Sequence, residues 1–212
     1  MTTSSSKENI LKKIRQALSN PVPVPFPGSE GNNSVFQPPA DDLEVLFAQE
    51  FTKLLGKFAY ALNGKDMIAQ IELLLAEKKW TKVFCSDPEL VKKFAGTTIS
   101  TYFMTDIAGC DVSITGCEYL IARTGTVVLS SAQQDGRTAS VYAPVHICVA
   151  YISQLIYDIK DGLMGLKEKY QGKLPSMVSF ATGPSRTADI EKTLVVGVHG
   201  PKEAYVFLVD KF

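Results

Sequence analysis

The residues best suited to chemistry are polar side chains that directly follow apolar stretches. The most specific group lies at 182–191, with the sequence TGPSRTADIE. Gly183 and Pro184 should end a strand expected at 177–181, and residues 186–192 should form one or two turns of helix. A helix that begins just after a strand offers free N–H groups and the positive end of its dipole to an anion. The candidate ligand-binding residues of this group are Gly183, Ser185, Arg186, Thr187 and Asp189. A serine cap and an arginine–aspartate pair are also common structural devices, so these residues could instead brace the turn.

A second group surrounds a Thr-Gly-Thr sequence. Thr124, Gly125 and Thr126 open an apolar stretch, and a glycine between two hydroxyl residues lets backbone N–H groups approach a ligand, although an ordinary tight turn has the same sequence. Glu118 lies upstream, where we expect a short helical turn. It is the candidate catalytic residue, as a general acid, general base or nucleophile, if burial raises its pKa.

Arg137 and the two histidines complete the set of candidate ligand-binding residues. Arg137 lies in a polar loop at 133–140, where a guanidinium can hold a carboxylate or phosphate in a two-point fork or can simply be solvated. His146 begins an apolar strand, and His199 lies at the edge of another. Two histidines cannot build a multi-histidine metal site, and we expect no metal.

Helices and strands alternate in the expected secondary structure, which predicts an α/β fold with helices packed on a sheet. Several strands are near-continuous apolar runs, as in strands covered on both faces. Because ligands of open α/β sheets bind at the carboxyl ends of strands, we expect the candidate loops to meet there. The expected helices lie near 5–20, 41–62, 65–79, 88–95 and 153–170, and the expected strands near 81–85, 98–103, 126–130, 146–151, 177–181, 194–198 and 205–209.

Composition narrows the class of protein. The 22 basic and 22 acidic side chains balance, so nothing in the charge favours nucleic acid or an anionic membrane as a partner. The most apolar stretch, 141–157, is interrupted by proline and polar residues, so no membrane span is expected. The first residues lack the apolar core of a signal peptide, which predicts a cytoplasmic protein. Alternating prolines after residue 20 predict an N-terminal helix and proline-rich linker at 1–40, followed by one α/β domain at 41–212.

Cysteine spacing and nucleotide-binding motifs exclude several other classes. The chain has four cysteines and no Cys-x-x-Cys pair, so zinc ribbons and cysteine-run iron–sulfur clusters are not expected. In the cytosol these cysteines should be reduced and buried. The sequence has no P-loop, no Gly-x-Gly-x-x-Gly and no nucleophile elbow.

The polar groups together resemble the LUD-domain family, which is named for lactate utilization. The resemblance covers about residues 40–210 and implies a fold like that of the sugar-isomerase, CoA-transferase and formyltetrahydrofolate cyclo-ligase superfamily, an open and largely parallel α/β sheet. Position 123 is Arg, where relatives often have an acidic residue, so Glu118 is the nearest carboxylate. The runs that carry the resemblance are 115–129, 136–137 with 144–147, 183–191 and 197–201.

The resemblance also implies a role in oxidising L-lactate to pyruvate, together with two partner proteins that carry iron–sulfur clusters. It implies no cluster on this chain, and it assigns no reaction step to particular residues. Two alternatives stay open. One is a stand-alone enzyme of CoA-transferase or isomerase type that acts on a small anionic metabolite, with Glu118 as the catalytic group and Arg137 and Arg186 as anion clamps. The other is a non-catalytic ligand-binding or scaffold module.

Overall fold

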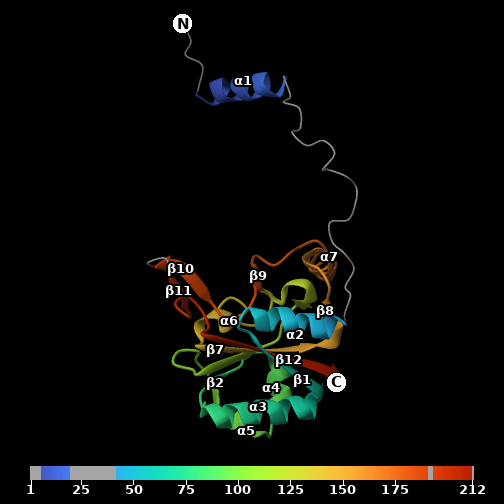
Figure 1. Ribbon diagram of the computed structural model, residues 1–212, viewed down its shortest axis with the longest axis vertical. Helices are drawn as coiled ribbons and strands as arrows, with labels where there is room; N and C mark the ends of the chain where they lie inside the picture. Colours follow the sequence, from blue (N-terminus) through green and yellow to red (C-terminus); the bar gives the residue numbers. More distant parts are fainter. Residues whose placement is uncertain (1–5, 20–41, 191–192, 212) are drawn as a thin grey trace. The chain divides into compact units, whose positions relative to one another are not determined.

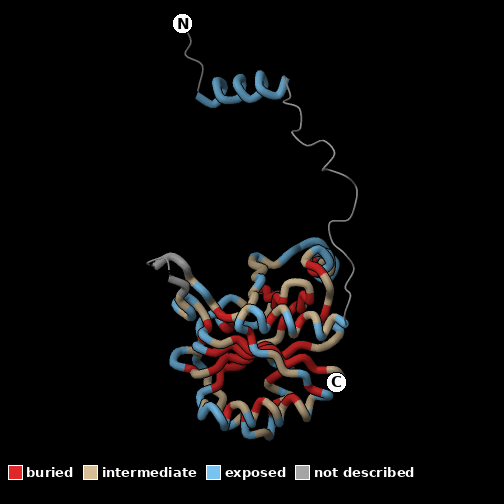
Figure 2. Tube along the Cα trace, in the orientation of Figure 1, coloured by how far each residue is buried: buried red, intermediate tan, exposed pale blue. Residues whose placement is uncertain are grey.

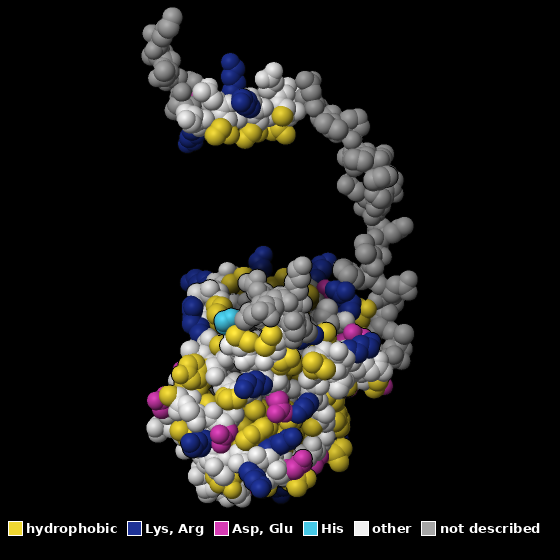
Figure 3. Space-filling model, turned by 60° about the vertical axis from the view of Figure 1, so that its left-hand side comes forward, with side chains coloured by type: hydrophobic (Ala, Val, Ile, Leu, Met, Phe, Trp, Pro, Cys, Tyr) yellow, Lys and Arg dark blue, Asp and Glu magenta, His cyan; other side chains and the backbone are white. Residues whose placement is uncertain are grey.

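The computed structural model describes residues 6–19, 42–190 and 193–211, without the side chains of 188–190 and 193–194. The chain divides into two compact units, Met1–Pro38 and Pro39–Phe212. In the first unit the described element is helix α1 (Ser6–Leu18), none of whose residues is buried. Its hydrophobic side chains lie along one side and its basic side chains lie elsewhere (Figure 3), as in an amphipathic helix.

The second unit is built on a six-stranded sheet with the order β1-β12-β7-β4-β2-β3 (Figure 1). Every neighbouring pair in it is parallel. The expected α/β fold with an open, largely parallel sheet and flanking helices is therefore confirmed. The strands are β1 (Lys57–Asn63), β2 (Val83–Phe84), β3 (Phe103–Met104), β4 (Val112–Thr115), β7 (Val145–Tyr151) and β12 (Glu203–Lys211).

One face of this sheet is covered by three helices. Alternate residues of β7 point to opposite faces, and Val145, Ile147 and Val149 join a core with side chains such as Ile71 and Phe94. Figure 2 colours most of the central strands as buried. The helices are α3 (Gly64–Lys78), α4 (Pro88–Phe94) and α5 (Thr98–Thr101).

The other face packs against helix α2 (Leu43–Lys53) and a second, four-stranded sheet with the order β8-β5-β6-β9. Helix α7 (Ile159–Lys169) covers the far side of that second sheet through Leu166. The strands are β5 (Tyr119–Ile121), β6 (Thr126–Ser130), β8 (Leu155–Ile156) and β9 (Val178–Ala181). The remaining elements are η1 (Ala122–Thr124), α6 (Ala139–Tyr142), η2 (Ile152–Gln154), β10 (Arg186–Ile190) and β11 (Thr193–Val196).

The long helix expected at 41–62 is wrong in its second half. Helix α2 stops at Lys53, Leu55 adopts a positive φ of 68°, and residues from Lys57 onward form β1. The apolar residues that fit a helical repeat instead pair in parallel with β12, more than 140 residues away in the sequence. Long-range pairing of this kind overrides local helix propensity.

Two other boundaries also differ from expectation. Residues 98–101 form α5 rather than a strand, because Thr97 and Ser100 hydroxyls bond back to nearby carbonyls and Ile99 packs into the core. The helix expected at 153–170 begins only at Ile159, where Asp158 accepts hydrogen bonds as its N-cap.

Candidate functional site

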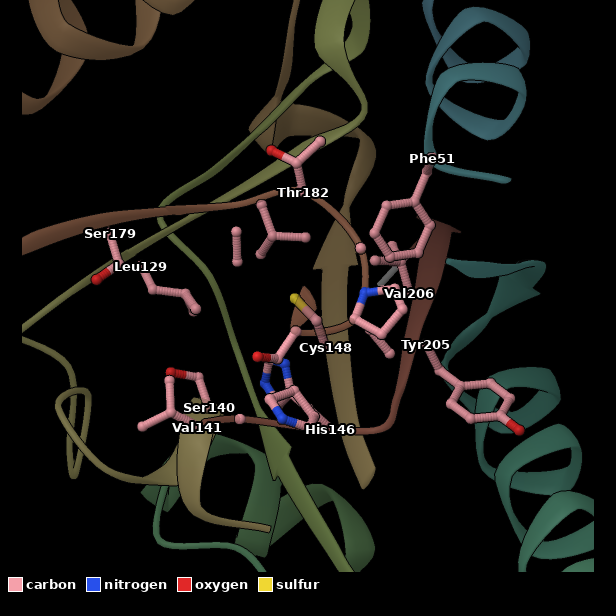
Figure 4. A pocket seen from close by; sticks show the side chains of 18 of the residues that line it. Phe51, Leu129, Ser140, Val141, His146, Cys148, Ser179, Thr182, Tyr205 and Val206 are labelled. Carbon is pink, nitrogen blue, oxygen red and sulfur yellow. The ribbon is translucent and has the colours of Figure 1, made fainter. Parts of the chain in front are cut away.

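A cavity of about 390 Å³ lies between the six-stranded sheet, the second sheet and the end of α2; we call it the inter-sheet cavity (Figure 4). His146 and Cys148 of β7 line it from one side, Leu129 of β6 from another and Phe51 of α2 from a third. His146 and Ala204, which also lines it, are the second residues of β7 and β12. The cavity therefore lies at the amino-terminal parts of these strands, not at the carboxyl ends where we expected the candidate loops.

A second cavity, of about 330 Å³, does lie at the carboxyl ends of β2, β4 and β7. Its lining includes Asp87, Glu89, Lys93 and Lys169. None of the candidate residues from the sequence lines it. The candidate residues that reach a cavity do so at the inter-sheet cavity.

The segment after β9 does not form the expected helix. Residues Arg186–Ile190 are strand β10, paired antiparallel with β11 so that Arg186 lies opposite Val196. The pairing partner is a later segment rich in valine, so a non-local ladder replaces the local helix. The site consequently has no helix N-terminus at this point, and attraction for an anion must come from side chains.

Two of the sequence runs that resemble the family are joined here by backbone hydrogen bonds. The Ser185 N–H donates to the Pro201 carbonyl at 2.9 Å, and the Gly197 N–H donates to the Ser185 carbonyl at 2.9 Å. A Cβ on Gly200 would lie 2.9 Å from the Ser185 Cβ, so a glycine is needed for this close approach. Ser185, Arg186 and His199 all line the inter-sheet cavity as a result.

Gly183 lines the cavity for a structural reason. Its φ is +82°, and a Cβ at this position would lie 2.5 Å from the Leu54 carbonyl oxygen. Glycine is therefore required both by the left-handed backbone and by the contact with the end of α2. This contact brings the loop and Phe51 to the same cavity.

The Thr124–Thr126 group supports the cavity without lining it. The Thr126 hydroxyl lies 2.7 Å from the Thr124 hydroxyl and 2.9 Å from the Thr182 hydroxyl, and Thr182 faces the cavity. Gly125 has a φ of +57°, and a Cβ there would lie 2.4 Å from the Phe51 backbone nitrogen. The close approach that Gly125 permits in this structure is to helix α2.

His146 is buried at the base of the site. Its Nε2 lies 2.8 Å from the Thr115 hydroxyl on the neighbouring strand β4. Burial lowers the pKa of His146 to about 4, so the imidazole is neutral near pH 7. It can offer an uncharged hydrogen bond to a bound molecule.

The charge of the inter-sheet cavity has one sign. Arg186 and His199 line it and are exposed, and none of its described lining residues is acidic. Hydroxyl groups of Ser140, Thr182 and Ser185 add hydrogen-bond donors. This arrangement suits an anion held by Arg186.

Glu118 is placed differently from the expectation. It directly precedes β5, is not on a helical turn, and is not among the residues that line the inter-sheet cavity. Its carboxylate accepts hydrogen bonds from Ser130 (2.6 Å), Lys169 (2.7 Å) and Tyr170 (2.7 Å). Burial pushes its pKa upward, but these hydrogen bonds outweigh burial and leave the pKa below its ordinary value. The raised pKa that a general acid would need is absent.

Two further candidates, Arg137 and Thr187, lie outside the cavity lining, and the side chain of a third, Asp189, is not described. Arg137 is exposed and donates a hydrogen bond to the Ser176 hydroxyl. Thr187 pairs with Val195 in the β10–β11 hairpin. Asp189 belongs to β10, but its side chain is not among those the structure describes.

Several lining residues were not selected from the sequence. Cys148 could have been found, because it follows His146 by two positions in a strand and must share its face. Ser140 lies in the same polar run as Arg137, and Thr182 directly precedes Gly183. Phe51 carries no signal, since only the fold brings α2 to this place.

The buried state of the cysteines agrees with the sequence-based expectation. All four cysteines are free and buried, as expected. Among the described residues, no group of three or more His, Cys, Asp or Glu side chains could hold a metal ion. No helix in the described part of the chain has the length and apolar character needed to cross a bilayer.

A family model and several known proteins match this chain. A family model for the LUD domain matches residues 65–209. An uncharacterized protein of Neisseria meningitidis serogroup B is 37% identical over 112 residues, which cover 53% of this chain and 46% of the relative. Lactate utilization protein C of Shouchella clausii is 39% identical over 101 residues, which cover 47% of this chain and 44% of the relative. The chain thus matches less than half the length of these curated relatives.

A solved structure supports the fold. It is a DUF162 family protein from Deinococcus radiodurans, which matches with a TM-score of 0.57 at 19% sequence identity. The match covers 79% of this chain and 96% of that chain. At this low identity the likeness shows the shared fold alone.

Proposed function

This chain belongs to the LUD-domain family, and from that premise we propose that it is a cytoplasmic subunit of an L-lactate utilization system. In this proposal it works with iron–sulfur partner subunits and binds a small anionic ligand in the inter-sheet cavity. Relatives named lactate utilization protein C, 36–39% identical over about half of this chain, support the system. Its own cysteines are buried and spaced unlike a cluster-binding run, which is consistent with clusters on the partners.

The ligand proposal rests on one observation: two sequence runs that resemble the family, 183–191 and 197–201, meet at one cavity. Ser185 and Pro201 are linked by a backbone hydrogen bond. Arg186 and His199 belong to the same two runs, and both line the cavity. Arg186 supplies the charge, Ser185 and Thr182 supply hydroxyl donors, and His146 supplies a neutral partner deeper in. In this proposal these groups bind and orient the anion.

Growth of a deletion strain tests the role in lactate utilization. We expect deletion of the gene to abolish growth on L-lactate and leave growth on glucose unchanged. Wild-type chain and the Arg137→Ala variant should restore growth, whereas Arg186→Ala should not. The tagged chain should also copurify with iron-containing proteins. Normal growth of the deletion strain on lactate, with no such copurification, would refute the proposal.

The geometry does not favour a stand-alone enzyme built on Glu118. Its carboxylate accepts hydrogen bonds from three donors, and it is not a lining residue of the inter-sheet cavity. A stand-alone enzyme would need another catalytic group, and a scaffold would need none. Turnover of a metabolite by the purified chain alone would separate these alternatives from the subunit proposal.

A further inference from the structure

We propose that the inter-sheet cavity takes an amphipathic anion with an apolar body much larger than the methyl group of lactate. This inference rests on the anion site of the proposed function and specifies its ligand class. The ligand would have an anionic group at the exposed end of the cavity, an apolar body inside it, and room for an uncharged polar group near His146.

The size of the cavity is the first argument. About 390 Å³ falls within the range of cavities that enclose ligands of many atoms. Lactate would fill only a small part of this volume. Water would occupy the rest, and water that lies against apolar side chains is readily displaced by an apolar group.

The apolar inner wall of the cavity is the second argument, because its side chains offer water few hydrogen-bond partners. Its inner wall comes from α2, the second sheet and the six-stranded sheet. Figure 4 shows Phe51, Leu129 and Cys148 around one hollow. The apolar side chains of this wall are Phe51, Val127, Leu129, Cys148, Ala181 and Val206. Transfer of an apolar group from water to such a wall is favourable, by about a fourfold gain in affinity for each buried methylene.

The distribution of polar groups is the third argument. Arg186 and His199 are exposed, whereas His146 is buried and neutral. A charged group is therefore best placed at the exposed end, where it keeps part of its hydration. The deep end accepts a hydroxyl or carbonyl but would penalise a second charge.

Calorimetric titration of the full chain tests this inference. The ligands are L-lactate, 2-hydroxyhexanoate, 2-hydroxy-4-phenylbutanoate and the neutral amide of the last acid. We expect 2-hydroxyhexanoate to bind roughly 50-fold more tightly than lactate, since it adds three methylenes. The amide should bind at least about 10-fold more weakly than its acid, since it lacks the charge that pairs with arginine.

Variants test separately how the cavity recognises the anionic group and how it recognises the apolar body. Arg186→Ala should weaken all the acids and leave the amide unchanged, whereas Arg137→Ala, an exposed arginine outside the cavity, should change nothing. Ala181→Leu places a larger side chain in the cavity and so reduces its volume. It should remove the higher affinity of the larger acids, while lactate binding persists.

The outcomes distinguish this inference from the proposed function. If lactate binds as tightly as the larger acids, and Arg186→Ala abolishes that binding, the inference is wrong and the anion site stands. If the amide binds as tightly as its acid, or if no acid binds, the anion site fails and the inference fails with it. The growth test on lactate is decided independently of both results.

Discussion

Two buried ionisable residues show how local partners decide charge. His146 and Glu118 are both almost fully buried. His146 has one hydroxyl partner, Thr115, and desolvation lowers its pKa to about 4, so it is neutral. Glu118 receives three hydrogen bonds, which overcome desolvation and keep it ionised. Burial alone therefore predicts the charge state of His146 but not that of Glu118.

The buried neutral state of His146 should make stability depend on pH. The unfolded chain binds a proton at His146 below about pH 6.5, whereas the folded chain binds it only below about pH 4. The free energy of unfolding should therefore fall as the pH drops from 6.5 to 4, by about 3 kcal/mol in total. Urea unfolding across this window checks it. His146→Gln, which keeps a hydrogen-bonding side chain, should have a flatter profile, and parallel profiles would contradict the assignment.

Glu118 should matter for stability rather than for ligand binding. Glu118→Gln removes a charge that accepts hydrogen bonds from Ser130, Lys169 and Tyr170. We expect a loss of about 1–3 kcal/mol in the free energy of unfolding, moderated because the Lys169 side chain is half-exposed. The exposed Glu89→Gln is the control and should change stability by less than about 0.5 kcal/mol. Weaker ligand binding by Glu118→Gln at unchanged stability would return Glu118 to the site.

At the scale of elements, close backbone contacts with α2 position the loops of the site. Gly125 and Gly183 touch the backbone of the α2 region at Phe51 and Leu54. Both glycines have positive φ, so neither position tolerates a side chain without strain. Both glycines allow a close approach to the α2 region, and Gly183 also lines the inter-sheet cavity.

Replacement of Gly125 tests the importance of this packing. Gly125→Ala would combine an unfavourable φ with a Cβ 2.4 Å from the Phe51 nitrogen, and we expect a loss of about 3 kcal/mol or more. Gly96→Ala is the matched control, because Gly96 has a φ of +78° with no heavy atom within 4 Å of the added Cβ. It should lose only about 1–2 kcal/mol. Equal losses in thermal or urea unfolding would show that contact with α2 contributes nothing at Gly125.

At the scale of the molecule, the hydrophobic clusters formed by the described residues lie in the second unit. Every residue of the four hydrophobic clusters lies at or after Leu43. In this unit the first strand, β1, and the last strand, β12, are neighbours in the six-stranded sheet. The division near residue 40 that the sequence predicts has a direct test in truncation.

A chain that starts at residue 39 should fold as stably as the whole chain. We expect its free energy of unfolding in urea to agree within about 0.5 kcal/mol, because the described residues that form the hydrophobic clusters all lie at or after Leu43 and none of the residues of α1 is buried. The inter-sheet cavity should also keep its ligand affinity. A loss of more than about 2 kcal/mol would mean that residues 1–38 are part of the folded domain.

The sequence by itself determined the class of fold, the family and part of the candidate site. Apolar strand runs such as 146–151 and 126–130 are recognisable because their burial is nearly continuous. Gly183, Ser185, Arg186, His146 and His199 were all selected from residue type and spacing, and all line one cavity. These features depend on short stretches of chain, where composition and pattern are informative.

Only the tertiary structure decided what depends on distant partners. Residues 57–63 and 186–190 became strands because β12 and β11 pair with them. Glu118 is ionised because Lys169 and Tyr170 come from a helix some fifty residues later. The cavity lies at the amino-terminal parts of β7 and β12 because α2 and a second sheet pack there. Pairing, charge and cavity shape are set by non-local contacts, whose free energies outweigh the local preferences that a sequence displays.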